Sequence, residues 1–364
     1  IFSSSPIPGN GASVANTINK LYLKGVKVYT NGASEIHSSG HANQDELKLM
    51  IRLFKPEYFA PYHGEYRMLK THCDLAISCD IKEENTFVSK LVDFEENLCV
   101  IPNVAIHLNR EINKGFVYNP QVDLLPLMGG KVGEKGLLHY LAHKYDISKE
   151  ELLGYDLFLY ARQKPSYVGI NKEFICAPRL DDLQCAFSLV MAIAEENPKD
   201  YVNICAIFDN EEVGSCTKQG ADSTFLEDVL ERISECFYLG KGAMRQKLAE
   251  SFLISADNCH AVHPNHTEKA DPTNKPVLNG GVVIKYNANQ KYTTDGVSAA
   301  KIKTLCTDAK VPFQTYVNRS DEPGGATLGN ISAAHISVNA ADIGLPQLAM
   351  HCSVETAGSE DTVY

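Results

Sequence analysis

The sequence predicts an α/β protein whose C-terminal half is a doubly wound domain. From residue 180 to 197, apolar residues recur at helical spacing. Four apolar runs with the length and composition of buried strands lie in the same half, at residues 201–210, 251–258, 281–288 and 312–319. The first 88 residues also alternate between helical and strand-like patterns. An irregular stretch rich in Asn and Pro follows them.

The first part of the chain contains three predicted helices and two predicted strands. The helical patterns cover residues 13–23, 44–54 and about 69–76, and the strand-like runs are 26–30 and 58–63. This alternation predicts a folded α/β region at residues 1–88.

The irregular stretch, residues 101–130, does not fit a sheet, so we predict an inserted or interface-forming region. A helix is predicted at residues 136–145. Ser148 and Glu151 have the spacing of a helix capping box, and residues 155–161 are predicted to form a strand. The predicted domains are residues 1–88, 89–176 and 177–364.

The composition is that of a globular protein, with 44% hydrophobic and 22% charged residues. No apolar run approaches the roughly 20 residues that span a bilayer, and no signal peptide is recognised, so we expect a cytoplasmic location and no membrane partner. The eleven cysteines include no CxxC pair, which argues against a disulfide framework. A net charge of -11 argues weakly against general nucleic-acid binding. Because the chain starts at Ile1 and stops in mid-pattern at Tyr364, we interpret both ends as cut.

Carboxylates and one histidine lie where the sheet of the C-terminal half is expected to end. Ligands gather at the carboxyl ends of strands in open α/β sheets. The residues at such positions are Glu211, Glu212, Asp257 and His351, and Asp181 opens the helix of residues 180–197. Carboxylates and an imidazole are ligands of hydrolytic zinc sites, and a further carboxylate can accept a proton from water. For any single acidic residue, a helix cap or a solvated loop is the simpler explanation.

Seven motifs in this order resemble the aminopeptidase I and aspartyl aminopeptidase family of zinc exopeptidases. They are IPNVAIHLNREIN, APRLDDL, FDNEEVGS, SADNCHAVHPN, GGVVIKYNANQKYTT, RSDEPGGATLG and LAMH, and they cover about residues 89–364. The resemblance implies a doubly wound mixed sheet with an inserted dimerisation domain. It also implies a metal-dependent aminopeptidase that acts on peptides and carries two zinc ions per site, with cobalt or manganese as alternatives.

The resemblance assigns a role to each matching residue. It makes Asp181 the bridging metal ligand, Glu212 and His351 ligands of one zinc, Asp257 a ligand of the other zinc, and Glu211 the general base. The family also has an upstream His-x-Asp element whose histidine completes the zinc bound by Asp257. That element does not occur in this chain.

Two further residues are implied to bind substrate. His107 matches a histidine that reaches the site of a neighbouring subunit, which implies a homo-oligomer. Lys285 matches a lysine near the acidic side chain of the substrate, although a partly exposed strand lysine explains the same pattern.

Residues 1–88 resemble a different enzyme, ribonuclease J, a nuclease of the metallo-beta-lactamase and beta-CASP type. The matching stretches are IFSSSPIPGN, IHSSGHANQDELKLMIRLFKP and PYHGEYRML. The resemblance implies that His37, Ser39 and His41 contact an RNA phosphate and that His63 is a zinc ligand. The nuclease's His-x-His-x-Asp-His cluster does not occur in this chain.

Three hypotheses about function follow. The first is a metal-dependent aminopeptidase, carried by the longer part of the chain. The second is an RNA-processing or RNA-binding role of the first part. The third is an inactive oligomeric scaffold produced by a chimeric reading frame.

Overall fold

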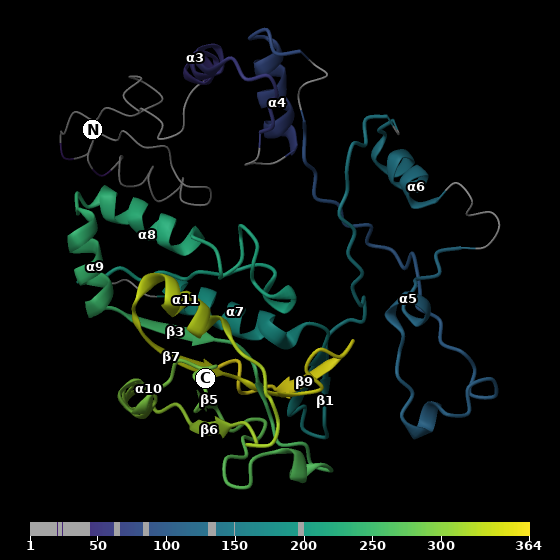
Figure 1. The fold of residues 1–364 in the computed structure, drawn as a ribbon, viewed down its shortest axis with the longest axis vertical. Coiled ribbons are helices and arrows are strands. Elements are labelled where there is room, and N and C mark those ends of the chain that lie inside the picture. Colours follow the sequence, from purple (N-terminus) through teal and green to yellow (C-terminus); the bar gives the residue numbers. More distant parts are fainter. Residues whose placement is uncertain are drawn as a thin grey trace. The chain divides into compact units, whose positions relative to one another are not determined.

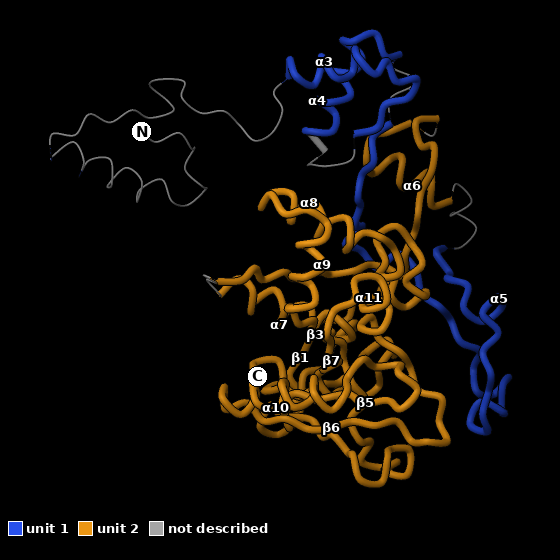
Figure 2. Tube along the Cα trace, turned by 60° about the vertical axis from the view of Figure 1, so that its left-hand side comes forward, with its two compact units in different colours: residues 1–134 blue, residues 135–364 orange. Residues whose placement is uncertain are grey.

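The structure is a computed structural model that describes residues 20, 24, 44–61, 66–82, 87–129, 136–148, 150–195 and 200–364. The chain divides into two compact units, residues 1–134 and 135–364 (Figure 2). Each unit is described by itself. The domain boundaries at residues 88 and 176 stay predictions. The strand at 26–30 and, apart from the helical residue 20, the helix at 13–23 fall outside the described residues.

The first unit has a small core between two helices. Helix α3 (Gln44–Phe54) and helix α4 (Tyr66–Ile77) confirm two of the predicted helices. Ile51 of α3 is buried with Ala76, Cys79 and Ile81, and Phe59 packs against this cluster. Residues 58–61 form no strand, so the described part of the strand predicted at 58–63 is wrong. Among the described residues, Phe59 has only isolated bridge geometry, and its carbonyl accepts a hydrogen bond from the Phe87 amide.

The described part of the irregular stretch, residues 101–129, has little regular structure, as predicted. It contains a 3-10 helix, η2 (Ile112–Lys114), and one short helix, α5 (Pro120–Asp123), which Asn119 caps. Leu127 forms an isolated antiparallel bridge with Val100.

The described residues of the second unit form a mixed α/β fold with two sheets (Figure 1). Its helices are α6 (Gly136–Tyr145), α7 (Leu180–Glu195), α8 (Phe225–Cys236), α9 (Lys241–Glu250), α10 (Gly296–Ala309) and α11 (Leu328–Ile336). One sheet has the order β3-β7-β5-β6, with β3 (Phe252–Ala256), β7 (Asn339–Gly344), β5 (Val282–Tyr286) and β6 (Phe313–Val317). The pairs β3/β7 and β5/β6 are parallel, and β5/β7 is antiparallel, which confirms a mixed sheet.

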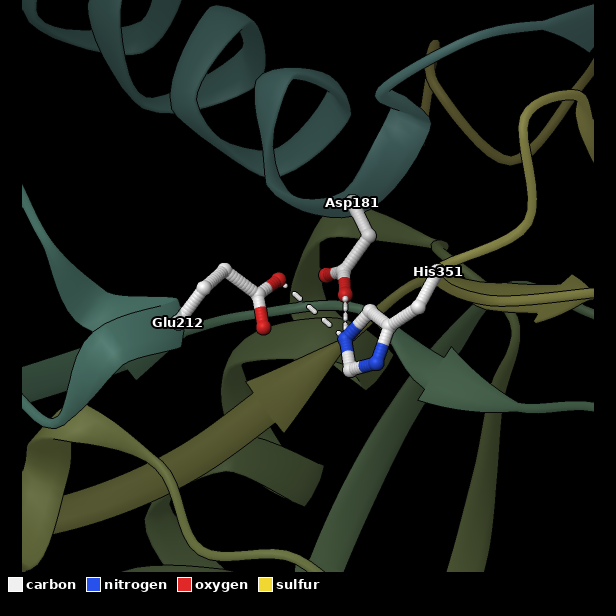
Figure 3. A group of neighbouring side chains, drawn as sticks. All are labelled: Asp181, Glu212 and His351. Carbon is white, nitrogen blue, oxygen red and sulfur yellow. Dashed lines mark ion pairs between the residues drawn. The ribbon is translucent and has the colours of Figure 1, made fainter. Parts of the chain in front are cut away.

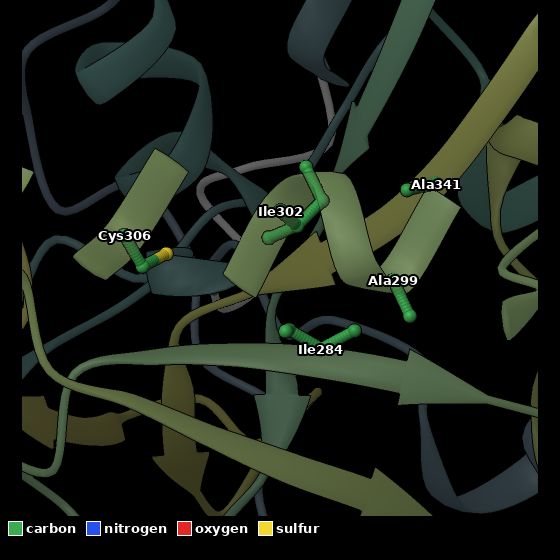
Figure 4. Packing of buried hydrophobic residues seen from close by; sticks show 5 residues of the cluster. All are labelled: Ile284, Ala299, Ile302, Cys306 and Ala341. Carbon is green, nitrogen blue, oxygen red and sulfur yellow. The ribbon is translucent and has the colours of Figure 1, made fainter. Parts of the chain in front are cut away.

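Helix α10 covers one face of this sheet (Figure 4). Ile284 of β5 is buried against Ala299, Ile302 and Cys306 of the helix and against Ala341 of β7. Because side chains alternate along a strand, Val283 and Lys285 face the opposite side from Ile284.

The second sheet lies around the predicted site residues. Its order is β1-β2-β9-β8-β4, with β1 (Ser166–Val168), β2 (Phe174–Ala177), β9 (Glu355–Gly358), β8 (Pro346–Leu348) and β4 (Cys259–His260). Glu355 pairs in register with Ala177, close before α7 begins. Residues 257 and 258 connect β3 of the first sheet to β4 of the second, so both sheets contribute to the site.

Two predicted strands of the second unit are wrong. Residues 155–161 and 201–210 form no strand, although three other predicted strands appear as β3, β5 and β6. The side chains of Tyr201, Val202 and Ile207 are each more than half exposed. A strand needs a partner for its backbone hydrogen bonds, and no described residue pairs with this segment. Residues 201–210 therefore have the apolar pattern of a strand, but they have no described partner strand.

Other local expectations had mixed outcomes. The Ser148 amide donates to Glu151 Oε2 and the Glu151 amide donates to Ser148 Oγ, but no helix follows this capping box. All eleven cysteines are free. Among the described residues, no helix has the length and apolar character needed to cross a membrane.

Candidate metal centre

Three of the predicted metal ligands meet at one point of the second unit (Figure 3). Asp181, Glu212 and His351 each offer one ligand atom, and these atoms lie within 4.8 Å of one another. His351 Nε2 is 3.1 Å from Asp181 Oδ2 and 3.1 Å from Glu212 Oε1. The side chain of Asp181 is only 7% exposed, whereas those of His351 and Glu212 are 60% and 56% exposed. The cluster is therefore buried on the Asp181 side and open to solvent on the other.

Each ligand comes from a different element. Asp181 lies at the start of α7, where the backbone of Asp181 and Asp182 is not yet helical. Glu212 lies in the 3-10 helix η4 (Glu211–Val213), and His351 lies in the turn after β8. Asp181 therefore does not act as a simple helix cap, because its carboxylate pairs with a histidine 170 positions away in the sequence.

Glu355 holds two of these segments together. Glu355 is 2% exposed and is the first residue of β9. Its Oε1 accepts the His351 amide at 2.7 Å, and its Oε2 accepts the Asp181 amide at 3.0 Å. Sequence reasoning missed Glu355, although its proximity to His351 in the sequence was a usable signal.

Asp257 follows β3 and lies beside the same cluster. One oxygen of Asp257 lies within 4.8 Å of oxygens of Asp181 and Asp182. Lys285 Nζ donates to Asp257 Oδ2 at 3.2 Å and to the Asn258 carbonyl at 2.7 Å. Lys285 is 2% exposed, which contradicts the alternative of a partly exposed strand lysine. Its substrate-binding role stays a prediction.

Burial and neighbouring negative charges raise the pKa values of carboxyl groups in the cluster, which favours their protonated form. Burial, followed by the charges of Asp257 and Glu212, raises the pKa of Asp181 to about 7. The pKa of Glu211 is also raised, first by burial and then by Asp257 and Glu212. Burial alone would lower the pKa of Lys285, but its neighbours, Asp257 foremost, raise it above its ordinary value.

The remaining predicted residues are not brought to this cluster by any described contact. His107 is exposed and lies in a turn of the first unit, and its substrate-binding role stays a prediction. The ribonuclease-like residues His37, Ser39, His41 and His63 lie outside the described residues.

The chain matches two family models. Residues 69–364 match the model described as aminopeptidase I zinc metalloprotease (M18). Residues 25–88 match the model described as the RNA specificity domain of Zn-dependent metallo-hydrolases. The two matches overlap at residues 69–88.

Curated relatives are named as aminopeptidases. The chain is 46% identical over 290 residues to a probable M18 family aminopeptidase 2 of Clostridium novyi, covering 78% of this chain and 67% of the relative. It is 39% identical over 326 residues to a protein of the same name from Pseudomonas aeruginosa, covering 87% of this chain and 73% of the relative. A relative from Clostridium acetobutylicum is covered over 65% of its length.

Solved structures of similar fold are longer than this chain. One chain in the structure of the Ape4 and Nbr1 complex is 36% identical, with a TM-score of 0.68 over 74% of this chain and 56% of that chain. Chaetomium thermophilum mApe1 is 30% identical, with a TM-score of 0.62 over 75% and 63%. The S. cerevesiae mApe1 dodecamer is 27% identical, with a TM-score of 0.60 over 74% and 60%. Both the family model and the curated relatives show that this chain belongs to the aminopeptidase I zinc metalloprotease (M18) family.

Proposed function

We propose that this chain is a metal-dependent aminopeptidase that hydrolyses the N-terminal residue of peptides. The observation that carries the proposal is the cluster of Asp181, Glu212 and His351, with Glu211 beside it. Membership of the M18 family supports the same activity. The chain spans only part of the length of its relatives, so their aminopeptidase activity is a proposal for this chain.

The residues present fit a zinc ion. Two carboxylates and an imidazole nitrogen are donor types that zinc binds in catalytic sites. Asp181 Oδ1 is buried and has no hydrogen-bond partner among the described residues, so it is left with an unmet need for a cation or donor. When bound there, zinc supplies Lewis acidity, which acidifies water and polarises a carbonyl group.

We assign proton transfer and the positioning of the metal ligands to side chains of this chain. Glu211 accepts a proton from the attacking water, and its raised pKa makes the carboxylate a stronger base for that step. Lys285 fixes the orientation of Asp257 through the contact to Oδ2. Glu355 fixes the backbone of Asp181 and His351 and so holds the ligands in register.

Substitution of the base tests the proposal. Glu211→Gln keeps the size of the side chain but removes its basicity, and a general base contributes about 100-fold to 10,000-fold to rate. We expect kcat for release of the N-terminal residue from short peptides to fall in that range, at unchanged zinc content. Asp209→Asn, an exposed carboxylate two residues earlier, is the matched control. Equal rates in the parent and Glu211→Gln would exclude Glu211 as the base.

We also propose a homo-oligomer in which His107 serves the site of a neighbouring subunit and residues 89–176 form the inserted dimerisation region. A solved dodecamer among the similar structures supports an oligomer. His107→Ala should lower kcat without changing the mass of the assembly in sedimentation. A full-size, fully active His107→Ala protein would contradict the assignment. The doubly wound arrangement and a cytoplasmic location, which the free cysteines favour, belong to the same proposal.

A second function is favoured by the match of residues 25–88 to an RNA specificity domain. We propose that the first part is a ribonuclease J-like fragment of beta-CASP type that binds RNA phosphates through His37, Ser39 and His41, with His63 as a metal ligand. Filter binding of single-stranded RNA by the full chain, compared with a His37→Ala and His41→Ala double variant, tests it. RNA retention that does not differ between the two would contradict it.

A further inference from the structure

A buried polar network centred on Asn258 joins elements that carry the proposed metal ligands. Asn258 directly follows Asp257 in the sequence and is 2% exposed. Its Nδ2 donates to Gln184 Oε1 at 2.9 Å and to Gln347 Oε1 at 3.3 Å. Its Oδ1 accepts a hydrogen bond from the Cys185 thiol at 3.3 Å. The side-chain amide therefore uses its donors and its acceptor at the same time.

The partners of Asn258 are close in sequence to two of the proposed ligands. Gln184 lies in α7, three residues after Asp181. Gln347 lies in β8, four residues before His351. Asn258 itself lies between β3 and β4. One side-chain amide therefore connects the start of α7 to β8 and to the segment between the two sheets.

The backbone of Asn258 is held as well. Its carbonyl accepts a hydrogen bond from Lys285 Nζ at 2.7 Å, and the same ammonium group donates to Asp257 Oδ2 at 3.2 Å. Gln184 Nε2 donates to Thr362 Oγ1 at 2.7 Å, so the network continues into the segment after β9. These contacts fix Asn258 relative to β5 and fix its partner in α7 relative to the end of the second sheet.

The network is a poor source of stability. None of Gln184, Cys185, Asn258 and Gln347 is more than 5% exposed. Gln347 Nε2 is buried and has no hydrogen-bond partner among the described residues. A buried donor without an acceptor lowers stability, whereas apolar side chains of the same shape are nearly neutral. The network therefore provides defined positions rather than a gain in stability.

We propose that Asn258 is a positioning residue that fixes the start of α7 relative to β8, and so sets the separation of Asp181 from His351. The inference rests on the proposed function, because it concerns ligands of the same metal centre. Glu355 already joins the two ligand segments through their backbone amides. Asn258 adds a second link between α7 and β8, and two links restrict rotation about either one.

Zinc affinity tests the positioning role without measuring peptide cleavage. Asn258→Leu keeps the approximate size of the side chain but removes its three hydrogen bonds. We expect it to weaken zinc binding by about tenfold or more, which is the usual cost of losing a residue that orients metal ligands. Competition with a chelating dye measures the affinity of the chelator-treated full chain. Parent-like affinity in a folded Asn258→Leu protein would overturn the proposal.

A stability control and a spectrum separate positioning from general loss of structure. Ile302→Ala weakens a core cluster that contains none of the proposed ligands, and it should bind zinc as the parent does. With Co²⁺ in place of zinc, the visible absorption bands report the geometry of the ligands. Asn258→Leu should shift these bands or change their intensity, and Ile302→Ala should not. Bands that are the same in the parent and Asn258→Leu would contradict the role.

The partner residues supply a second set of variants. Gln184→Met removes an acceptor of the Asn258 amide at similar volume, so it should also weaken zinc binding. Because the two residues act through one contact, the double variant should lose less affinity than the two single losses combined. Fully additive losses would overturn the proposal. If Asn258→Leu does not fold, Gln184→Met and Gln347→Met carry the test, and parent-like zinc affinity in both would overturn it.

The outcome is separable from that of the proposed function. A chain that cleaves peptides, but whose Asn258→Leu variant binds zinc as the parent does, overturns the positioning role alone. A chain whose Asn258→Leu variant loses zinc affinity as expected, but which cleaves no peptide, overturns the aminopeptidase proposal alone.

Discussion

At the scale of single residues, Glu355 carries the clearest structural role outside the ligand set. Its two oxygens accept the amides of His351 and Asp181, so both ligand segments depend on one side chain. Glu355→Gln replaces one acceptor oxygen by a donor, and we expect zinc affinity to fall by about 10-fold to 100-fold. Competition with a chelating dye measures the change. Glu360→Gln, an exposed neighbour, should have no effect, and unchanged affinity in Glu355→Gln would contradict the role.

The raised pKa values of Asp181 and Asp182 predict a pH dependence of stability in the metal-free protein. In the folded chain these pKa values are about 7 and about 8, whereas in the unfolded chain they are about 3.9. The folded state therefore binds more protons between about pH 4 and pH 8, so this contribution to stability is present below pH 4 and is lost as the pH rises through 7 to 8.

Thermal unfolding at several pH values measures this contribution. The chelator-treated parent should lose stability relative to Asp182→Asn as the pH rises from 5 to 8, because the amide carries no charge to bury. Added metal should reverse the loss in the parent, since metal binding takes the place of protons. A difference between the two proteins that does not depend on pH would contradict the prediction.

The ligand residues could be predicted from sequence, and the residues that support them could not. Asp181, Glu212 and His351 stood at strand ends or a helix start and within ordered motifs, and the structure brings them together. Glu355 had the appearance of an ordinary strand residue, since its importance comes from two amides that only the fold places beside it. The burial of Lys285 could not be predicted from sequence for the same reason, because only the fold places its neighbours beside it.

At the scale of elements, strand predictions succeeded where a partner strand was present. Strands β3, β5 and β6 were expected from their apolar runs, and each pairs with a described strand. The run at 201–210 is equally apolar but has no described partner, and it forms no strand. Local sequence carries the pattern of a strand, but pairing is a property of residues distant in the chain.

Helix α10 offers a matched pair of substitutions that test the core. Ile302 is 3% exposed in the cluster with Ile284 and Ala341, whereas Leu305 on the same helix is 54% exposed. Ile302→Ala should lower the free energy of unfolding by about 2 to 5 kcal/mol. Leu305→Ala should change it by about 0.5 kcal/mol or less. Urea unfolding measures both, and equal losses would contradict the assignment of the core.

At the scale of the whole molecule, the two compact units have separate cores. The cluster around Ile51 and Ala76 belongs to residues 1–134, and the cluster around Ile284 and Ile302 belongs to residues 135–364. Units with their own cores open independently unless a large apolar interface joins them. The sequence pattern changes near residue 89, from alternating helical and strand-like segments to an irregular stretch, and this change indicated two parts. No pattern in the sequence predicted a division at residue 134.

Hydrogen exchange tests the independence of the units. Ile302→Ala should speed amide exchange in the peptides of β5, β7 and α10, because it weakens the core that they share. Exchange in α3 and α4 should stay as in the parent. Equal acceleration in both units would show that they unfold together.

The central claim is that Asp181, Glu212 and His351 hold zinc, and the zinc content of the purified full chain tests it most directly. After dialysis against metal-free buffer, the parent and Asp209→Asn should retain at least one zinc per chain by mass spectrometry. Asp181→Asn, which keeps the shape of the side chain but removes its charge, should retain little. Zinc retained equally by the parent and a folded Asp181→Asn protein would contradict the claim.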